Sequence, residues 1–361
     1  MLRTSVCLNM IVRNERKVIL RCLESVKPMI HSWLIIDTGS TDGTQDLICN
    51  FMKNIPGGLY ERPWVNFSVN RNEALSLAKQ HSQADYLLFI DADEKLQFSE
   101  RFVMPDWGAD AYLGIVRLAS GSEFSRVFLI KRTLNCYWRG VVHEELVCRK
   151  KKGIEVLRDP IIYSIGDGNR SRDRYRYFKD AKDLEASLAQ DPDNTRIIFL
   201  LAQCYLGAHA FEKAMQLYRK RVEMGSGFEG EIYLSLYAIA QIERICKKEA
   251  AFWVSSYWEA FKYYPHRAEP LFWINTHYLA ISDYNTGYEL AKKAQYISYP
   301  DDDLPIERWI YEYGLFMQLS DFCYFLGKRQ EAKEALDQLL EYPLPSAVRR
   351  TAEEKLKKLY N

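Results

Sequence analysis

The sequence lacks long apolar runs and has no marked surplus of charge of either sign. None of its apolar runs reaches the roughly 18 residues of a membrane-spanning helix, and the apolar stretch at residues 5–12 is too short for a signal peptide core. The 49 basic and 48 acidic residues nearly cancel, whereas nucleic-acid-binding proteins usually have a basic surplus. We therefore expect a cytoplasmic protein without a nucleic-acid partner. At most, peripheral membrane contact is expected, through the basic residues 150–152 or 170–176.

Paired cysteines and a phosphate-binding loop are also missing. The eight cysteines are scattered, with no Cys-x-x-Cys pair and no spacing typical of metal ligands. Free thiols in a reducing compartment are therefore expected, rather than disulfides or a zinc site. No Gly-x-x-x-x-Gly-Lys-Ser/Thr sequence occurs, which argues against a nucleotidyl- or phosphoryl-transfer enzyme.

The first half of the sequence alternates predicted strands with predicted helices. Apolar runs indicate strands at residues 5–12, 33–36, 58–61, 86–90, 111–118 and 127–131. Periodic apolar residues and capping residues indicate helices at residues 15–26, 44–54 and 69–81. Short strand–helix–strand connections imply right-handed crossovers between parallel strands. We therefore predict an α/β domain over residues 1–168, with a Rossmann-like and mostly parallel sheet.

From about residue 169 onward the pattern is nearly all helical. Prolines at 192, 265 and 300 fit a helix-pair repeat of about 34 to 36 residues, if the first gap holds two repeats. Tetratricopeptide-like spacings occur at Leu201-Ala202-x-x-Tyr205 with Ala214 and Tyr218, and at Leu319-Ser320-x-x-Cys323 with Ala332 and Leu336. We predict an all-α tetratricopeptide-like domain over residues 169–361, with an irregular helical bundle as the alternative. The basic run at 170–176 is interpreted as a solvated helix start rather than a phosphate site.

Three carboxylates follow a strand that is predicted to be buried on both faces. The strand is Tyr86-Leu87-Leu88-Phe89-Ile90, and Asp91-Ala92-Asp93-Glu94 comes directly after it. Ligands of open α/β sheets bind outside the carboxyl ends of the strands. Carboxylates this close repel one another unless a cation or strong hydrogen-bond donors lie among them. The sequence therefore predicts a site for a hard cation at this edge of the sheet.

Four short motifs follow predicted strands or open a predicted helix. They are Val12-Arg13-Asn14-Glu15, Ile36-Asp37-Thr38-Gly39-Ser40-Thr41-Asp42-Gly43-Thr44, Asn70-Arg71-Asn72-x-Ala74-Leu75 and Ile90-Asp91-Ala92-Asp93-Glu94. In this order they resemble the nucleotide-sugar-binding half of family-2 glycosyltransferases, over about residues 4–145. The resemblance implies the GT-A fold and an inverting sugar transfer. It also implies that Mn²⁺ or Mg²⁺ neutralises the charge of the diphosphate leaving group.

The same resemblance implies a role for each acidic residue and for Asn14. Asp93 would be the main metal ligand, and Asp91 would bind the metal or the donor ribose. Asp37 would accept hydrogen bonds from the uracil or the ribose. Asn14 and Glu15 would line the pocket of the base.

For Arg71, Trp64 and Phe67, a functional role and a structural role are both open. Arg71 would reach a phosphate of the donor, or form a structural salt bridge. Trp64 and Phe67 would form one wall of the sugar site, or belong to the core.

A second polar cluster lies at Tyr137-Trp138-Arg139-Gly140-Val141-Val142-His143-Glu144-Glu145. Together with Arg126, it resembles a segment of family-2 enzymes with a tetratricopeptide-type tail, among them bacterial peptide S-glycosyltransferases. The resemblance implies that His143 is a metal ligand or a phosphate donor. Inverting transfer needs a carboxylate that deprotonates the acceptor, and Glu144 or Glu145 are the candidates, with Glu94 third. A strand with a satisfied histidine and solvated glutamates is the structural alternative.

These patterns predict a metal-dependent hexosyltransferase that uses a UDP-sugar such as UDP-glucose. Two acceptor classes stay open: a peptide or protein held by the helical groove, and a lipopolysaccharide-core or other envelope glycan. A homodimer through the helical domain is a further assembly that this architecture allows. The alternative from another class is a non-catalytic helical-repeat scaffold with a decayed transferase domain. The intact Asp37, Asp91, Asp93 and His143 argue against decay.

Overall fold

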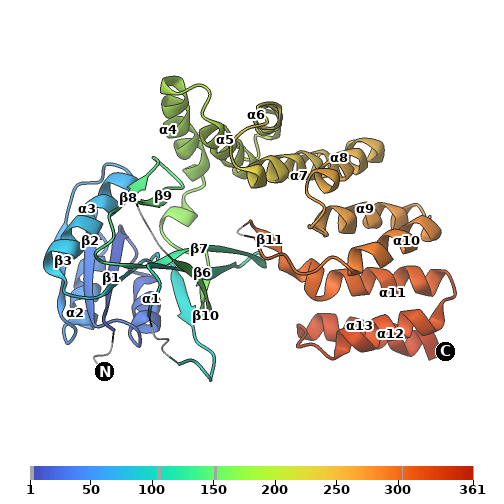
Figure 1. Ribbon diagram of the computed structural model, residues 1–361, viewed down its shortest axis with the longest axis horizontal. Helices are drawn as coiled ribbons and strands as arrows, with labels where there is room; N and C mark the ends of the chain where they lie inside the picture. The colour runs from blue at the N-terminus through green and yellow to red at the C-terminus, as the bar shows by residue number, and fades with distance from the viewer. Residues whose placement is uncertain (1–3, 104–106, 150–152, 303, 361) are drawn as a thin grey trace. The chain divides into compact units, whose positions relative to one another are not determined.

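The computed structural model describes residues 4–103, 107–149, 153–302 and 304–360 (Figure 1). The chain forms two compact units. The first extends to Asp191, and the second contains Pro192–Asp302 and the residues from Ile306 onward. Among the described residues, no helix is both long and apolar enough to cross a membrane.

Four parallel strands form one side of the sheet in the first unit. They are β1 (Val6–Val12), β2 (Ser32–Asp37), β3 (Gly57–Glu61) and β4 (Tyr86–Leu88). Their order is β3-β2-β1-β4, and each neighbouring pair is parallel, as predicted. Tyr86 and Leu88 belong to the core on one face of the sheet, and Leu87 to the core on the other. The strand before the carboxylates is thus buried on both faces.

Three helices and a small hairpin cover the two faces of these strands. The helices are α1 (Ile19–Val26), α2 (Thr44–Met52) and α3 (Phe67–His81). Apolar residues of α1 and α2 share one core, and those of α3 share the other with the hairpin β8–β9 (Cys136–Arg139 and Glu145–Cys148). The helix expected from residue 15 begins at Ile19, because residues 15–18 form a turn in which Val18 and Ile19 donate their N–H to the carbonyl of Glu15.

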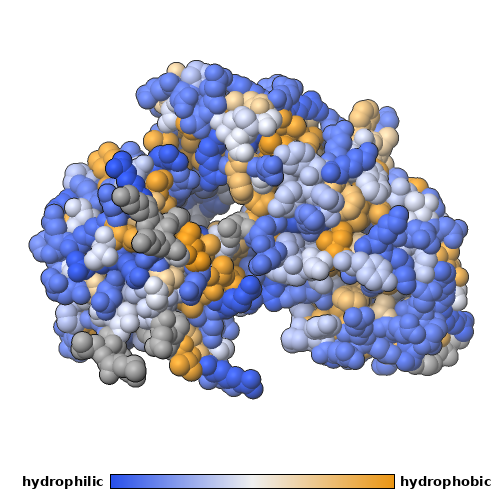
Figure 2. All heavy atoms as spheres, viewed as in Figure 1, coloured by the Kyte–Doolittle hydropathy of each residue, from blue (hydrophilic) through white to orange (hydrophobic). Residues whose placement is uncertain are grey.

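The other side of the sheet is mixed rather than parallel. Its strands are β5 (Glu94–Gln97), β6 (Ala111–Leu118), β7 (Ser122–Lys131) and β10 (Ile154–Ser164). Strand β7 is antiparallel to both β4 and β6, whereas β10 is parallel to β6 and antiparallel to β5. Figure 2 shows that apolar side chains reach the surface of the molecule. In β10, Ile154 and Val156 are each 45% exposed. The parallel arrangement predicted for most of the sheet therefore holds throughout β3-β2-β1-β4 and for the pair β6–β10, whereas the other pairs among these strands are antiparallel.

The expectation that all cysteines are free thiols is wrong for one pair. Cys136 and Cys148 lie directly opposite each other in the β8–β9 hairpin and form a disulfide. The pairing depends on the register of the hairpin, which cysteine spacing does not reveal. The other cysteines carry free thiols: Cys7, Cys22, Cys49, Cys204, Cys246 and Cys323. The basic residues 150–152, considered above for membrane contact, lie outside the described residues.

The first unit extends past the predicted domain end at residue 168. A short 3₁₀ helix (Arg170–Arg172) and helix α4 (Arg176–Gln190) follow β10 and belong to this unit. Asp180, Ala181 and Leu184 give α4 a buried face. The change to a helical pattern in the sequence thus precedes the structural boundary at Asp191.

The second unit is a series of helices in which each packs against the next along the chain. They are α5 (Thr195–Gly207), α6 (Phe211–Glu223), α7 (Glu229–Ile245), α8 (Ala250–Tyr263), α9 (Glu269–Ala280), α10 (Tyr284–Gln295), α11 (Leu315–Phe325), α12 (Arg329–Leu340) and α13 (Ser346–Tyr360), with a two-residue strand β11 (Ile306–Glu307) and a π-helical turn (Ile310–Gly314) before α11. All residues at the tetratricopeptide-like positions named above are buried, among them Ala202, Ala214, Tyr218, Cys323 and Ala332. Gly225 and Gly227 lie between α6 and α7, and Gly230 lies in the first turn of α7. These spaced glycines follow no strand, so they form no dinucleotide-binding turn.

Candidate functional site

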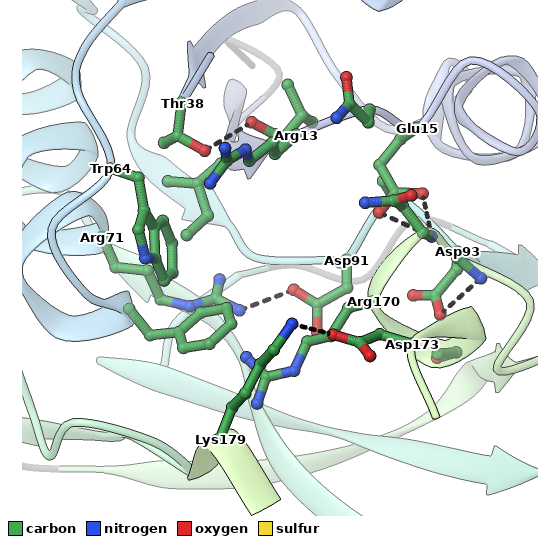
Figure 3. Close-up of a pocket in the computed structure, with 18 residues that line it drawn as sticks. Arg13, Glu15, Thr38, Trp64, Arg71, Asp91, Asp93, Arg170, Asp173 and Lys179 are labelled. Atoms are coloured by element: carbon green, nitrogen blue, oxygen red, sulfur yellow. Dashed lines mark hydrogen bonds and ion pairs between the residues drawn. The ribbon is translucent and has the colours of Figure 1, made fainter. Parts of the chain in front are cut away.

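A cavity of about 520 Å³ opens at the carboxyl ends of β1, β2 and β4, within the first unit (Figure 3). Its wall includes residues 11–15 after β1, Thr38 after β2 and residues 91–93 after β4. Helix α3 and the loop before it add Arg71, Phe67 and Trp64. Residues 168–171, Asp173 and Lys179 complete the wall. The cavity thus lies where parallel sheets of this kind bind their ligands.

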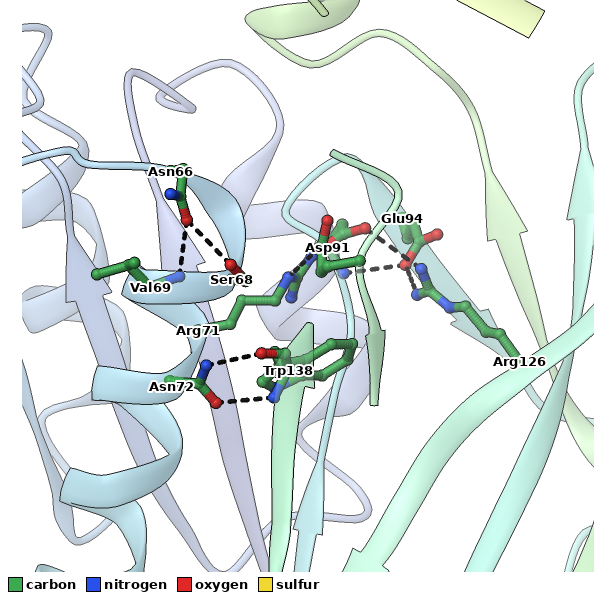
Figure 4. Close-up of polar contacts among 10 residues, drawn as sticks. Asn66, Ser68, Val69, Arg71, Asn72, Asp91, Glu94, Arg126 and Trp138 are labelled. Atoms are coloured by element: carbon green, nitrogen blue, oxygen red, sulfur yellow. Dashed lines mark hydrogen bonds and ion pairs between the residues drawn. The ribbon is translucent and has the colours of Figure 1, made fainter. Parts of the chain in front are cut away.

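Two arginines hold the carboxylate of Asp91 (Figure 4). Arg71 donates from Nη2 to Oδ1 at 2.7 Å, and Arg126 donates from Nη1 to Oδ2 at 3.3 Å. Burial raises the pKa of Asp91, but the two guanidinium groups outweigh burial and hold the pKa well below its ordinary value. Asp91 is therefore an ionised side chain with both oxygens already engaged.

The same arginines each bind a second carboxylate. Arg71 donates from Nε to Glu144, and Arg126 donates from Nη2 to Glu94. Glu94 is 3% exposed and also accepts the backbone N–H of Asp91 at 2.9 Å. This ion-pair network joins α3, the loop after β4, strand β7 and the hairpin β8–β9. For Arg71 the salt-bridge interpretation is confirmed, and the same side chain also lines the cavity.

Asp93 and Glu15 are carboxylates of the cavity wall that are held by backbone N–H groups. Gly168 donates to Oδ2 of Asp93 at 3.3 Å, and Asn169 donates to the carboxylate of Glu15 at 3.0 Å. Burial raises the pKa of Glu15 to about 7, and the nearby charge of Asp93 adds to this effect. Burial also raises the pKa of Asp93, with Asp91 adding. Burial is thus the main cause of both shifts, and the neighbouring carboxylates add to it.

Asn14 and Asp37 organise the loop that follows β2. Asn14 has a left-handed backbone (φ 56°), lines the cavity, and accepts the N–H of Thr41 at 2.8 Å. Asp37 is fully buried and is not in the cavity wall. Its Oδ1 accepts the N–H groups of Gly39 and Ser40 at 2.9 and 2.8 Å, while Oδ2 has no partner among the described residues. Asp37 therefore shapes the loop, and its neighbour Thr38 reaches the cavity.

Trp64 and Phe67 form an aromatic wall of the cavity. Their rings meet edge to face with centroids 4.8 Å apart. Trp64 is 39% exposed, so it is not a core residue.

The predicted catalytic cluster on the β8–β9 hairpin lies outside the cavity wall. Glu144 contacts Arg71, and Glu145 pairs with Arg139 at the surface. His143 is exposed and has a left-handed backbone (φ 50°). Asn72 binds the hairpin by accepting the N–H of Trp138 at 2.7 Å and donating to its carbonyl at 2.8 Å. The structure thus brings Glu144 next to the cavity through Arg71, but it brings neither Glu145 nor His143 into the wall.

The carboxylates of the cavity wall do not form a complete set of metal ligands by themselves. In the described part of the chain, no group of three or more His, Cys, Asp or Glu side chains is arranged to hold a metal ion. Asp91 and Asp93 both line the cavity, and two carboxylates suit a cation such as Mg²⁺ that completes its shell with water and substrate phosphates. The residues therefore fit an open site that a substrate completes, and His143 lies outside this cavity wall.

Sequence reasoning missed the contribution of residues 168–179 to the cavity. Gly168 packs so closely against Asp93 that a Cβ atom there would lie 2.9 Å from its Oδ2. Arg170 and Lys179 line the cavity, although the basic run at 170–176 was interpreted as solvated. The charge of this run was the available signal, but its position relative to the sheet edge was not visible in the sequence.

Comparisons with known proteins agree with this architecture. Residues 7–101 match the model of glycosyl transferase family 2, and residues 181–224 match a tetratricopeptide repeat model. The chain thus contains a segment similar to glycosyl transferase family 2, followed by a segment similar to a tetratricopeptide repeat.

Individual relatives match smaller parts of their own length. A TPR repeat-containing protein of Synechococcus elongatus is 25% identical over 261 residues, which are 68% of this chain and 62% of that protein. The SPbeta prophage-derived glycosyltransferase SunS of Bacillus subtilis is 40% identical over 86 residues, which are 23% of this chain and 18% of SunS. The chain therefore spans less than two thirds of the length of either relative. Among solved structures, MamA is similar with a TM-score of 0.37 and 16% identity, over 54% of this chain and 97% of MamA.

Proposed function

We propose that this protein is an inverting glycosyltransferase that moves a hexose from a UDP-sugar, with UDP-glucose as the first donor to test. The observation that carries the proposal is the cavity at the carboxyl edge of β1, β2 and β4. In it, Asp91 and Asp93 share one wall with Asn14 and Glu15. The match to glycosyl transferase family 2 over residues 7–101 supports the reaction class.

The chemistry of this transfer requires the charge of a departing diphosphate to be stabilised. Asp93, with Asp91 behind it, would hold Mn²⁺ or Mg²⁺, which supplies positive charge to the leaving group when bound. Arg71 is fixed by Asp91 and Glu144, so its position at the cavity wall does not depend on the substrate. Asn14, Glu15 and Thr38 would contact the nucleoside, and Trp64 with Phe67 would pack against the sugar.

A carboxylate must also take the proton of the acceptor. We keep Glu144, Glu145 and Glu94 as the candidates. Glu144 contacts the cavity residue Arg71, and Glu94 accepts the backbone N–H of the cavity residue Asp91. A role for Glu144 as the base requires the acceptor to approach from the side of the β8–β9 hairpin.

The acceptor is proposed to be a peptide or protein, or an envelope glycan of the lipopolysaccharide-core type. The tetratricopeptide-like unit favours the first class, because stacked helix pairs commonly present a groove to a partner chain. A homodimer through this unit is a further proposal, which sedimentation of the purified protein would test.

The test of the proposed donor site is binding and turnover of UDP-glucose with Mn²⁺ or Mg²⁺ present. Wild type should hydrolyse or transfer the sugar, and Asp93→Asn should lose at least about a hundredfold in turnover while keeping its melting temperature. Asp46→Asn, which changes an exposed residue in the first turn of α2, serves as the matched control. Turnover that is unchanged in Asp93→Asn would refute the metal assignment. Absence of nucleotide binding in the wild type would favour the scaffold alternative.

A further inference from the structure

Two cations of the cavity wall have no role in the function proposed above. Arg170 and Lys179 come from the 3₁₀ helix and from α4, which the sequence assigned to the helical domain. Figure 3 draws both side chains across the cavity from Arg13 and Thr38. Their positive charges favour an anionic ligand in a cavity whose carboxylates Asp91 and Asp93 would by themselves repel one.

Arg170 is held in a fixed orientation. Its Nη2 donates to both carboxylate oxygens of Asp180 at 2.6 Å, and Asp180 is 7% exposed. The guanidinium lies over the ring of Phe67 at 4.3 Å from its centroid. Within the described part of the chain, Nε and Nη1 have no hydrogen-bond acceptor. An arginine fixed in this way keeps a planar set of donors ready for a phosphate group without further loss of side-chain entropy.

Lys179 complements Arg170 as a mobile point charge. Its Nζ lies 2.5 Å from Oδ2 of Asp173, and the two side chains are 69% and 32% exposed. Exposed ion pairs of this kind contribute little stability. A ligand with more negative charge than one carboxylate can therefore draw the ammonium group away from Asp173.

We propose that Arg170 and Lys179 form a phosphate-binding site in the cavity wall. The ligand class is a diphosphate or phosphate ester, which has the charge and the oxygen geometry that a fixed guanidinium and an adjacent ammonium group recognise. The phosphate comes either from the diphosphate of the sugar donor or from a phosphate on the acceptor. The first source rests on the function proposed above, whereas the site itself does not.

The test measures binding of UDP, uridine and inorganic pyrophosphate to the full-length chain by calorimetry, with Mn²⁺ present. Lys179→Ala and Arg170→Ala should each weaken UDP and pyrophosphate by about tenfold or more, and leave uridine unchanged. Lys182→Ala and Arg174→Ala are the matched controls, since both residues are exposed neighbours outside the cavity wall. If Arg170→Ala does not fold, Arg170→Lys replaces it, because this variant keeps the positive charge. Lys179→Ala changes an exposed side chain that folding does not require, so it tests the site in either case.

The outcomes distinguish a donor diphosphate from an acceptor phosphate, and they test the phosphate site separately from the proposed donor. Loss of UDP and pyrophosphate binding together assigns the site to the donor diphosphate. Loss of pyrophosphate binding with UDP unaffected assigns it to an acceptor phosphate. If wild type binds pyrophosphate through these cations but no UDP, the phosphate site stands and the proposed donor fails. If neither variant changes binding of either anion, the phosphate site is refuted, even where Asp93→Asn confirms the donor site.

Discussion

Arg71 contacts both Asp91 and Glu144, and this arrangement is compatible with two different roles for Glu144. As an acceptor base, Glu144 would act on the substrate itself. As a positioning residue, it would hold Arg71, whose other nitrogen binds Asp91. The two explanations predict different kinetic effects, because Arg71 lines the donor cavity and the base acts on the acceptor alone.

Glu144→Gln is therefore expected to lower kcat by about a hundredfold with unchanged UDP affinity if Glu144 is the base. Glu145→Gln changes the other candidate on the hairpin, an exposed partner of Arg139, and is measured beside it. Steady-state kinetics together with UDP calorimetry provide both readouts. A loss of UDP affinity at constant kcat would instead assign Glu144 to positioning Arg71. Normal transfer by both variants would exclude this hairpin as the source of the base.

Glu15 makes the stability of the protein depend on pH. Burial, with Asp93 and Asp42 adding, raises its pKa from the ordinary 4.5 to about 7. Between pH 4.5 and about pH 7, Glu15 therefore stays protonated in the folded state but is ionised in the unfolded chain. The stability contributed by the protonated form is complete below pH 4.5 and is lost as pH rises through about 7.

Glu15→Gln should consequently lose less thermal stability than wild type between pH 5 and pH 8. Gln keeps the size and the carbonyl acceptor for the Asn169 N–H, but it does not ionise. Melting temperatures across this range, measured by calorimetry without divalent cations, give the comparison. Parallel curves for the two proteins would show that Glu15 ionises normally.

At the scale of elements, the β8–β9 hairpin is tied to the rest of the unit by few contacts. Asn72 pairs with the backbone of Trp138, and the ring of Trp138 meets Phe89 edge to face at 5.3 Å. The Cys136–Cys148 disulfide closes the hairpin at its open end. The disulfide thus limits the freedom of the segment that presents Glu144 to Arg71.

Removal of this disulfide is expected to destabilise the first unit. Cys136→Ser with Cys148→Ser should lower the free energy of unfolding by about 2 to 3 kcal/mol, since the crosslink spans only 12 residues. Hydrogen exchange should accelerate in residues 136–148 before it does in the strands of the sheet. Cys49→Ser, at an exposed free thiol, is the control. Equal stability of the double variant and wild type would mean that the hairpin holds without the crosslink.

The strands that lead to the cavity could be predicted from the sequence, because their burial on both faces requires apolar residues. The runs at β1, β2 and β4 are apolar because both sheet faces are covered, and this leaves a direct pattern in the sequence. The positions of the motif residues could then be inferred from the ends of these strands. Asn14, Glu15, Asp91 and Asp93 do line one cavity.

Other features depend on contacts between residues far apart in the sequence. Asp37 was expected at the ligand, but two backbone N–H groups of its own loop turn its carboxylate inward. Predicting the disulfide would have required the register of the β8–β9 hairpin. Predicting the antiparallel strand β7 beside β4 would have required the order of the strands in the sheet. Residues 168–179 carry a charged helical pattern that does not reveal which unit they pack against.

At the scale of the whole molecule, the boundary at Asp191 makes a prediction about fragments. A chain of residues 1–191 retains η1 (Arg170–Arg172) and α4, and with them the cavity wall of Gly168, Arg170 and Lys179. A chain of residues 1–168 keeps Gly168 but loses Arg170, Lys179 and the Asn169 N–H that binds Glu15. The longer fragment should therefore bind UDP within about tenfold of the full chain, and the shorter one should bind at least tenfold more weakly than the longer. Calorimetry with both fragments checks this, and equal affinities would place residues 169–191 outside the site.

The central claim is that the cavity at the sheet edge binds a nucleoside diphosphate with the help of Asp93 and a divalent cation. The most direct measurement is calorimetry of UDP binding to the full chain, with and without Mn²⁺, for wild type, Asp93→Asn and Asp46→Asn. We predict tight binding that needs Mn²⁺ in wild type and Asp46→Asn, and that is lost in Asp93→Asn. Binding of UDP that is independent of both Mn²⁺ and Asp93, or no binding in the wild type, would contradict the claim.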